Sequence, residues 1–162
     1  MQDIIPVNKP NTAIKTSLLS GDISKESHCA DLVEMKPDII FHLASVVSGE
    51  AEKDFDKGWL MNTRATWHLL ENIRKANMFS EGVYRPKLIF TSSIAVFGPP
   101  FPDKIGDDFL CAPQTSYGAQ KAITEMLISD YSRKEFIDGI SIRLPTICVR
   151  PGKPNLAASG FF

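Results

Sequence analysis

The 162-residue sequence is poor in the residues that build metal sites and disulfide frameworks. It holds three histidines and three cysteines. Cys29, Cys111 and Cys148 are odd in number and widely spaced, and no Cys-x-x-Cys pair occurs. His28 beside Cys29 is more often a chance neighbour than a metal ligand. Neither a zinc site nor a disulfide framework is therefore expected, and a resident metal is not predicted.

Long hydrophobic runs and an excess of charge are also absent. The longest apolar runs, such as IIFHLASVV, are too short to span a membrane, and the first residues, MQDIIPVNKPN, lack the features of a signal peptide. The formal net charge is −1, so nothing directs the chain to nucleic acid or to an anionic membrane. A reduced, cytoplasmic location follows as the default expectation.

Apolar runs alternate along the chain with segments of helical periodicity, which predicts an α/β fold with a mainly parallel sheet. The hydrophobic fraction of 43% and the length suit one domain with a real core. Ser24 is the expected N-cap of the first helix, and the continuous run 38–45 favours a strand buried on both faces. The expected elements are an extended segment at 13–22, strands at 38–45, 87–93 and 139–145, helices at 24–35, 55–78 and 116–136, and a surface loop at 98–114.

Polar residues stand where the predicted strands end. The sequences concerned are HLAS (42–45), TSS (91–93) and RLPTI (143–147). In open parallel sheets ligands bind beyond the carboxyl ends of the strands. These three segments are therefore expected to meet at one edge of the sheet and to form the site.

The segment SYGAQK (116–121) places a tyrosine four residues before a lysine at the start of a predicted helix. Tyr117 and Lys121 would share one helix face, and the lysine and the helix N-terminus would both lower the phenol pKa from about 10. For this spacing alone, a capping tyrosine and a solvated lysine are the commoner interpretation. Ser92 and Ser93, which end the preceding strand, reverse that preference because a serine hydroxyl there can orient a substrate oxygen toward the tyrosine.

Together with GDIS (21–24), HLAS and Asn62, the segments TSSIAVFG (91–98) and SYGAQK resemble the extended short-chain dehydrogenase/reductase family, which includes the NAD-dependent nucleotide-sugar epimerases and dehydratases. The resemblance runs through nearly the whole chain and implies a partial Rossmann-like doubly wound parallel sheet. The stretches HLASVVSGEAEKDFDKG, SSIAVFG and IRLPTICVRPGKPN are more narrowly similar to the group of this family that oxidises D-erythronate.

The resemblance implies a role for each matching residue. Tyr117 would accept the proton, Lys121 would lower the tyrosine pKa and hold the nicotinamide ribose, and Ser93 rather than Ser92 would bind the reacting oxygen. Ser48 would contact the substrate, as would Val47 beside it. The implied cofactor is NAD, and the residues expected along it are Asp3, Asp22, Ile23, Leu43, Ala44, Ser45, Asn62, Tyr117, Lys121, Pro145 and Ile147.

One feature of the family is missing from the sequence. The chain has no Gly-x-x-Gly-x-x-Gly turn, which in the family lets the backbone reach the cofactor pyrophosphate. Residues 1–150 are therefore expected to form an incomplete dinucleotide-binding domain, and 151–162 the start of a truncated substrate domain. Without the first strand, the sheet should expose an apolar edge, which predicts poor stability or self-association of the chain in isolation.

Three functions remain open from the sequence. The first is an NAD-dependent dehydrogenase of a small, D-erythronate-like sugar acid. The second is a nucleotide-sugar epimerase or dehydratase that uses the same site. The third is a non-catalytic truncated chain that cannot hold the cofactor. A homodimer is compatible with each, whereas nucleic-acid and membrane partners are not expected.

Overall fold

The computed structural model describes residues 2–3 and 15–145, and its strands are all parallel. β1 (Gln2–Asp3) pairs with β2 (Leu19–Ser20) in a small sheet. A second sheet has the order β3-β4-β5 and consists of β3 (Ile39–His42), β4 (Lys87–Ser93) and β5 (Asp138–Leu144). The parallel strands with connecting helices confirm the predicted α/β, Rossmann-like class.

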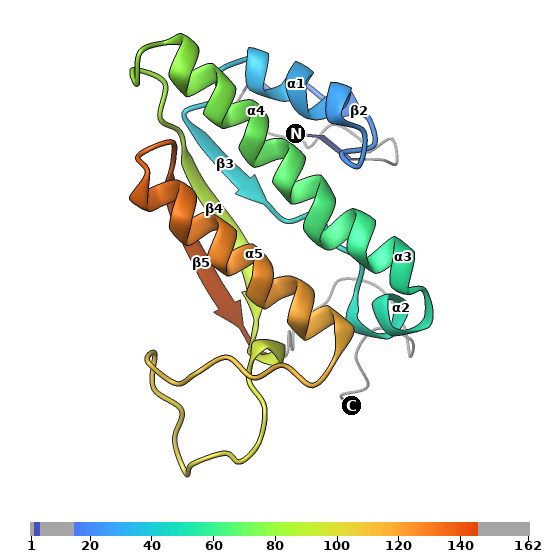
Figure 1. Cartoon of the computed structure of the whole chain (residues 1–162). Helices are drawn as coiled ribbons and strands as arrows, with labels where there is room; N and C mark the ends of the chain where they lie inside the picture. Colours follow the sequence, from blue (N-terminus) through green and yellow to red (C-terminus); the bar gives the residue numbers. More distant parts are fainter. Residues whose placement is uncertain (1, 4–14, 146–162) are drawn as a thin grey trace.

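The long helices lie on one side of the three-stranded sheet. α4 and α5 cross its face, and α1 packs along α4 (Figure 1). A π-helical turn, Trp59–Arg64, joins α3 to α4, and a short 3₁₀ turn, Ile94–Val96, follows β4. The helices are α1 (Glu26–Glu34), α2 (Ser48–Lys53), α3 (Phe55–Gly58), α4 (Ala65–Phe79) and α5 (Ser116–Arg133).

Some predicted boundaries differ from the structure. The helix expected at 55–78 is divided into α3, the π-helical turn and α4, and α2 was not predicted. Ser24 is not the N-cap of α1, which is Lys25. The reason is local: the Asp22 carboxylate accepts the Ser24 N–H at 2.9 Å and forms a turn ahead of the helix.

The hydrophobic core lies between the sheet and the helices. Leu70 and Ile73 of α4 pack with Leu88 and Phe90 of β4 and with Ile128 of α5. These side chains are almost completely buried, and each contributes roughly 1.5–3 kcal/mol by leaving water. The core therefore fixes α5, which begins with the predicted catalytic segment, against the central strand.

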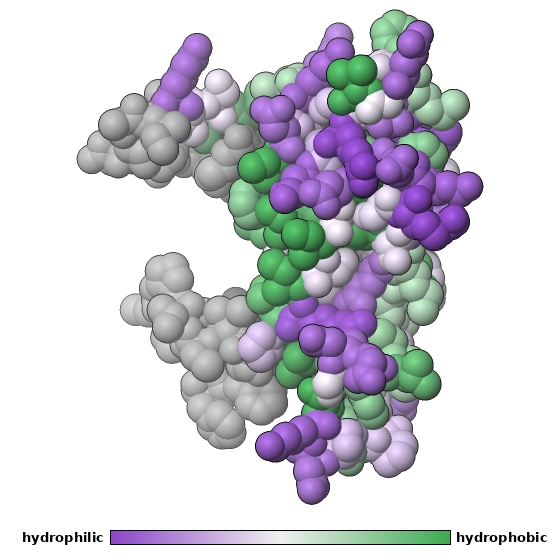
Figure 2. Space-filling view, turned by 90° about the vertical axis from the view of Figure 1, so that its left-hand side faces the viewer, coloured by the Kyte–Doolittle hydropathy of each residue, from purple (hydrophilic) through white to green (hydrophobic). Residues whose placement is uncertain are grey.

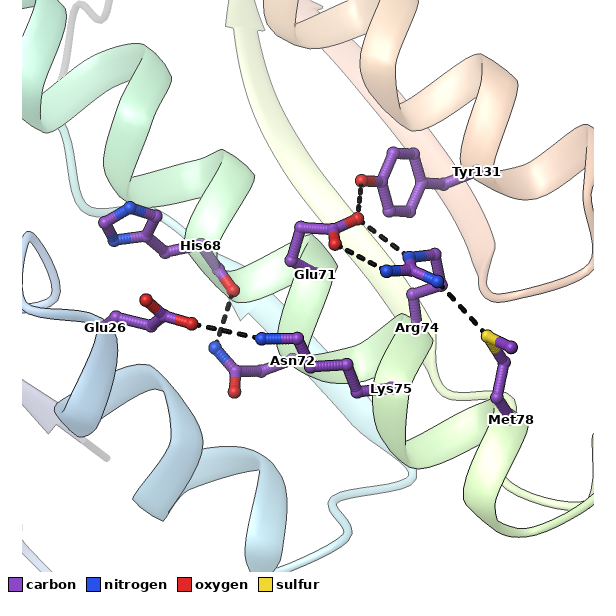
Figure 3. Close-up of polar contacts among 8 residues, drawn as sticks. All are labelled: Glu26, His68, Glu71, Asn72, Arg74, Lys75, Met78 and Tyr131. Atoms are coloured by element: carbon purple, nitrogen blue, oxygen red, sulfur yellow. Dashed lines mark hydrogen bonds and ion pairs between the residues drawn. The ribbon is translucent and has the colours of Figure 1, made fainter.

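Polar contacts connect α4 to its two neighbouring helices, α5 and α1 (Figure 3). The Glu71 carboxylate receives hydrogen bonds from Arg74 on its own helix and from Tyr131 on α5. The hydrogen bond from Arg74 is the largest cause that lowers the pKa of Glu71 to about 2. On the other side, Lys75 pairs with Glu26 of α1 at 3.2 Å. The α5 helix is thus held by polar as well as apolar contacts.

The opposite face of the sheet is open in the described part of the chain. Alternate side chains of β3 and β5 point to this face, and Ile39 and Phe41 are 54% and 65% exposed. Ile140 and Ile142 of β5 continue the apolar surface, and hydrophobic side chains form a band along one side of the molecule (Figure 2). The prediction that the strand at 38–45 is buried on both faces is wrong, because the described helices cover only one face.

This open face predicts concentration-dependent self-association of the purified chain. We expect the double substitution Phe41→Lys and Ile142→Lys to shift the molecule toward monomer, because charged side chains oppose stacking of two apolar sheet faces. Light scattering at several protein concentrations measures the change. Leu110→Lys is the matched control, since Leu110 is 82% exposed on the loop after β4. An equal effect of the control would show that the sheet face is not the contact.

Candidate active site

The start of α5 packs closely against the turn that follows β4. Thr115 caps the helix, and its hydroxyl accepts the N–H of Gly118 at 3.0 Å. A Cβ atom at Gly118 would lie 2.2 Å from the carbonyl oxygen of Ala95, so only glycine allows this close approach. The glycine therefore brings Tyr117, the residue before it, to the end of β4.

Ser93 and Tyr117 meet at this point. A side-chain hydrogen bond with Ser93 lowers the pKa of Tyr117, but burial raises it more, so the net pKa lies above the usual value of 10. Ser93 also accepts the N–H of Ala95 at 3.2 Å, which holds its hydroxyl in place. The phenol is thus protonated near neutral pH in the cofactor-free chain.

The Lys121 side chain lies near the Tyr117 ring, and Lys121 is only 2% exposed. Its ammonium donates to the carbonyl oxygen of Thr91 at 2.8 Å and lies 4.6 Å from the ring centroid of Phe90. The Tyr117 ring centroid is 5.5 Å away. Burial lowers the pKa of Lys121 from 10.5 to about 8. The predicted lowering of the Tyr117 pKa by Lys121 is therefore not found in this structure, because burial disfavours the charged forms of both groups.

The two serines at the end of β4 point to opposite faces of the sheet. Ser93 faces Tyr117, whereas Ser92 donates to Glu125 on the side covered by α5. Glu125 is also held by Arg143 of β5, with an N–O distance of 2.9 Å. Ser92 is thus occupied in a structural cluster, and this geometry favours Ser93 over Ser92 as the reactive serine.

The end of β3 presents the segment expected along the cofactor. Leu43 and Ala44 are exposed, and the hydroxyl of Ser45 donates to the side-chain oxygen of Asn62 at 2.9 Å. The same Asn62 oxygen accepts the N–H of Val46 at 2.8 Å. Asn62 was expected along the cofactor; in the structure its side-chain amide holds the loop after β3.

The acidic residues predicted near the adenosine lie at the end of the small sheet. The carbonyl oxygen of Asp3 accepts the N–H of Gly21 at 3.0 Å, next to Asp22. The Asp22 pKa is lowered first by the hydrogen bond from the Ser24 backbone, so this carboxylate is charged at neutral pH. Ile23 is partly buried and packs against the core. The structure therefore brings Asp3 and Asp22 close in space.

Of the remaining predicted site residues, the structure describes all but Ile147. Ser48 begins α2 and is half-buried, and Val47 beside it is exposed. Pro145 directly follows β5 and is exposed, whereas Ile147 lies outside the described residues. Sequence reasoning missed Gln120 and Thr124 of α5, which contact Asn62. Their only signal was a pair of polar residues on the buried side of a helix.

Two classes of site are not found in the described residues. Between residues 15 and 145, no helix combines the length and apolar character needed to cross a membrane. In the same part of the chain, no three His, Cys, Asp or Glu side chains are grouped closely enough to hold a metal ion.

Comparison with known protein families agrees with this geometry. The model of the family described as "NAD dependent epimerase/dehydratase family" matches residues 2–159. The chain belongs to this family. The matched region of the chain therefore includes β3, β4 and α5, the elements that carry the candidate site.

Relatives of this family member include two proteins named D-erythronate dehydrogenase. The one from Cupriavidus necator is 47% identical over 147 residues, which are 91% of this chain and 44% of that protein. The one from Haemophilus influenzae is 44% identical over 159 residues, which are 98% of this chain and 49% of that protein. The chain thus spans about half the length of these relatives.

Solved structures of the family show the same fold. A nucleoside-diphosphate-sugar epimerase from Agrobacterium tumefaciens superposes with a TM-score of 0.89 and 54% identity, over 99% of this chain and 46% of that one. UDP-glucose 4-epimerase from Brucella ovis, solved in complex with NAD, has a TM-score of 0.67 and 26% identity. The match covers 78% of this chain and 37% of that one. The described strands and helices are therefore the family fold.

Proposed function

We propose that this chain is part of an NAD-dependent dehydrogenase that oxidises a hydroxyl of a small sugar acid resembling D-erythronate. The observation that carries the proposal is the meeting of Ser93, Tyr117 and Lys121 at the carboxyl end of β4. The two relatives named D-erythronate dehydrogenase support the choice of substrate class. The same three residues would also serve an epimerase, so the choice of a dehydrogenase is supported by the two relatives with that name.

The residues present fit the two ends of NAD. The charged Asp22 carboxylate suits ribose hydroxyls or adenine, and the exposed backbone at Leu43 and Ala44 suits the cofactor edge. The Lys121 ammonium has three N–H donors, and the hydrogen bond to Thr91 uses one of them. Two donors are therefore left for the nicotinamide end of the cofactor. The sequence lacks a glycine-rich turn for the pyrophosphate, so we expect the chain alone to bind NAD weakly.

In the proposed reaction, the Ser93 hydroxyl orients the substrate hydroxyl and the Tyr117 oxygen takes its proton. Bound NAD would supply the hydride acceptor for the substrate carbon and a positively charged ring near Tyr117. Loss of that proton and that hydride converts the alcohol of the substrate into a carbonyl group. Because burial raises the Tyr117 pKa, its oxygen can act as a base only when positive charge near it favours the phenolate. We propose that Lys121, whose ammonium lies 5.5 Å from the Tyr117 ring centroid, supplies that charge when the cofactor is bound.

A nucleotide-sugar epimerase is the second candidate, favoured by the name of the Agrobacterium tumefaciens structure. It would use the same three residues but would return the hydride to the substrate. A net gain of reduced cofactor therefore separates the two functions.

The domain boundaries are also proposed. We infer that residues 1–150 are part of the cofactor-binding domain and that 151–162 begin a substrate-binding region. The share of the relatives that the chain covers, 44% and 49%, supports a larger enzyme.

The test is a titration of the purified chain with NAD and with NADP, followed by measurement of reduced cofactor formed with D-erythronate. We expect NAD to bind more tightly than NADP, and D-erythronate to produce reduced cofactor without a nucleotide sugar. Conversion of a nucleotide sugar without net reduction of NAD would favour the epimerase. Absence of all cofactor binding would support the non-catalytic alternative for this chain.

A further inference from the structure

Asn62 is the point where three elements of the site meet. Its side-chain oxygen accepts from Ser45 and from the N–H of Val46, and its side-chain nitrogen donates to Gln120 at 2.8 Å. Its backbone oxygen lies 3.2 Å from the hydroxyl of Thr124. Asn62 therefore contacts the loop after β3 and the helix α5 at the same time.

The π-helical turn gives Asn62 this double contact. In this turn the N–H of Ala65 bonds to the carbonyl of Leu60, five residues back. Such turns interrupt an α-helix and are frequent at functional sites. Here the Asn62 carbonyl receives the hydroxyls of Thr66, at 3.2 Å, and of Thr124. Thr66 in turn lies 2.8 Å from the His42 ring at the end of β3, so the contacts at Asn62 extend to the strand.

We propose that Gln120 and Thr124 are positioning residues that act through Asn62 to hold the loop at 43–46 in a fixed place relative to Tyr117 and Lys121. Gln120 is completely buried and directly precedes Lys121, and Thr124 lies one helical turn further along α5. A shift of α5 moves Tyr117 and Lys121 together with Gln120. Through Asn62, that shift also moves the loop expected along the cofactor.

The meaning for cofactor binding depends on the proposed dehydrogenase function, whereas the coupling itself does not. Burial makes the coupling strong, because Asn62 is 2% exposed and water cannot easily replace its partners. Asn62 thus connects the helix that carries the proposed base to the loop expected along the cofactor.

Hydrogen exchange at the Val46 amide, measured on the cofactor-free chain, tests the coupling. We expect Gln120→Met to speed exchange of this amide about tenfold, as for loss of one buried hydrogen bond, because Asn62 contacts both Gln120 and the Val46 N–H. Gln120→Met should still fold, because the Gln120 side-chain nitrogen has no hydrogen-bond partner among the residues that the structure describes, and methionine removes that unpaired donor. Thr124→Val is the second variant, and Thr124→Ser should restore the wild-type rate.

Thr63→Val is the matched control, since the Thr63 hydroxyl is buried on the same turn and has no hydrogen-bond partner within the described part of the chain. It should leave Val46 exchange within about twofold of wild type. An unchanged Val46 rate in folded Gln120→Met, an equal effect of Thr63→Val, or uniform acceleration of all amides would overturn the proposal. NAD titration should show weaker binding for Gln120→Met and Thr124→Val than for Thr63→Val or the wild type. If the wild type binds no NAD, the proposed function fails while the exchange rates still decide the coupling.

Discussion

Replacing Tyr117 with phenylalanine should lower kcat/KM for D-erythronate by about 10²–10⁴-fold, the usual contribution of a positioned acid or base. The substitution removes only the phenolic oxygen that contacts Ser93. The ring remains, with the Lys121 ammonium 5.5 Å from its centroid, so the fold and the affinity for NAD should change little. Turnover and NAD titration measured on the same preparation separate the loss of proton transfer from a loss of binding.

The same helix offers a matched control in Tyr131. Its hydroxyl donates to Glu71 and lies on the side of α5 that faces α4 (Figure 3). Tyr131→Phe should therefore lower stability by about 1 kcal/mol, the usual net value of one hydrogen bond, and leave turnover near wild type. Full activity of Tyr117→Phe, or an equal loss in Tyr131→Phe, would contradict the role assigned to Tyr117.

The arrangement of strands could be predicted from sequence because it depends on local patterns, and the candidate site was proposed from patterns of the same kind. Apolar runs alternating with helical periodicity predicted the parallel sheet, and β4 was predicted at its observed bounds, 87–93. Serine at a strand end, followed by Tyr-x-x-x-Lys at a helix start, predicted a site at Ser93 and Tyr117, and the two side chains interact in the structure. Such features need only neighbouring residues and the polarity of a parallel sheet.

The electrostatic state of the site could not be predicted in the same way. Helical spacing placed Lys121 on the face of Tyr117, but the pKa of each group depends on burial by distant parts of the chain. Phe90 and Thr91 enclose the Lys121 ammonium from β4, 30 residues earlier in the sequence. The π-helical turn at Asn62 was missed for a similar reason, because its hydrogen bonds to Gln120 and Thr124 are tertiary.

Burial of Lys121 predicts that removing its charge stabilises the protein. The Lys121 pKa is about 8 in the fold and 10.5 as an ordinary lysine, so near pH 7 the folded state bears the cost of a buried ammonium. This difference corresponds to roughly 3 kcal/mol at about 1.4 kcal/mol for each pKa unit. Lys121→Met keeps the aliphatic packing against Phe90 but loses the hydrogen bond to Thr91, so the free energy of unfolding at pH 7 should rise by about 1 kcal/mol, less than this difference.

The pH dependence gives this prediction its sign. Between pH 8 and 10.5 the unfolded chain keeps the Lys121 proton while the folded chain loses it, so wild-type stability rises with pH across this window. The advantage of Lys121→Met should therefore be largest near pH 7 and should disappear by about pH 10.5, as denaturant unfolding at a series of pH values can measure. Lys53→Met, at an exposed position, should show no such trend. A variant that is both more stable and inactive would mean that the charge of Lys121 is kept for chemistry, whereas equal stability at pH 7 would contradict its burial as an ammonium.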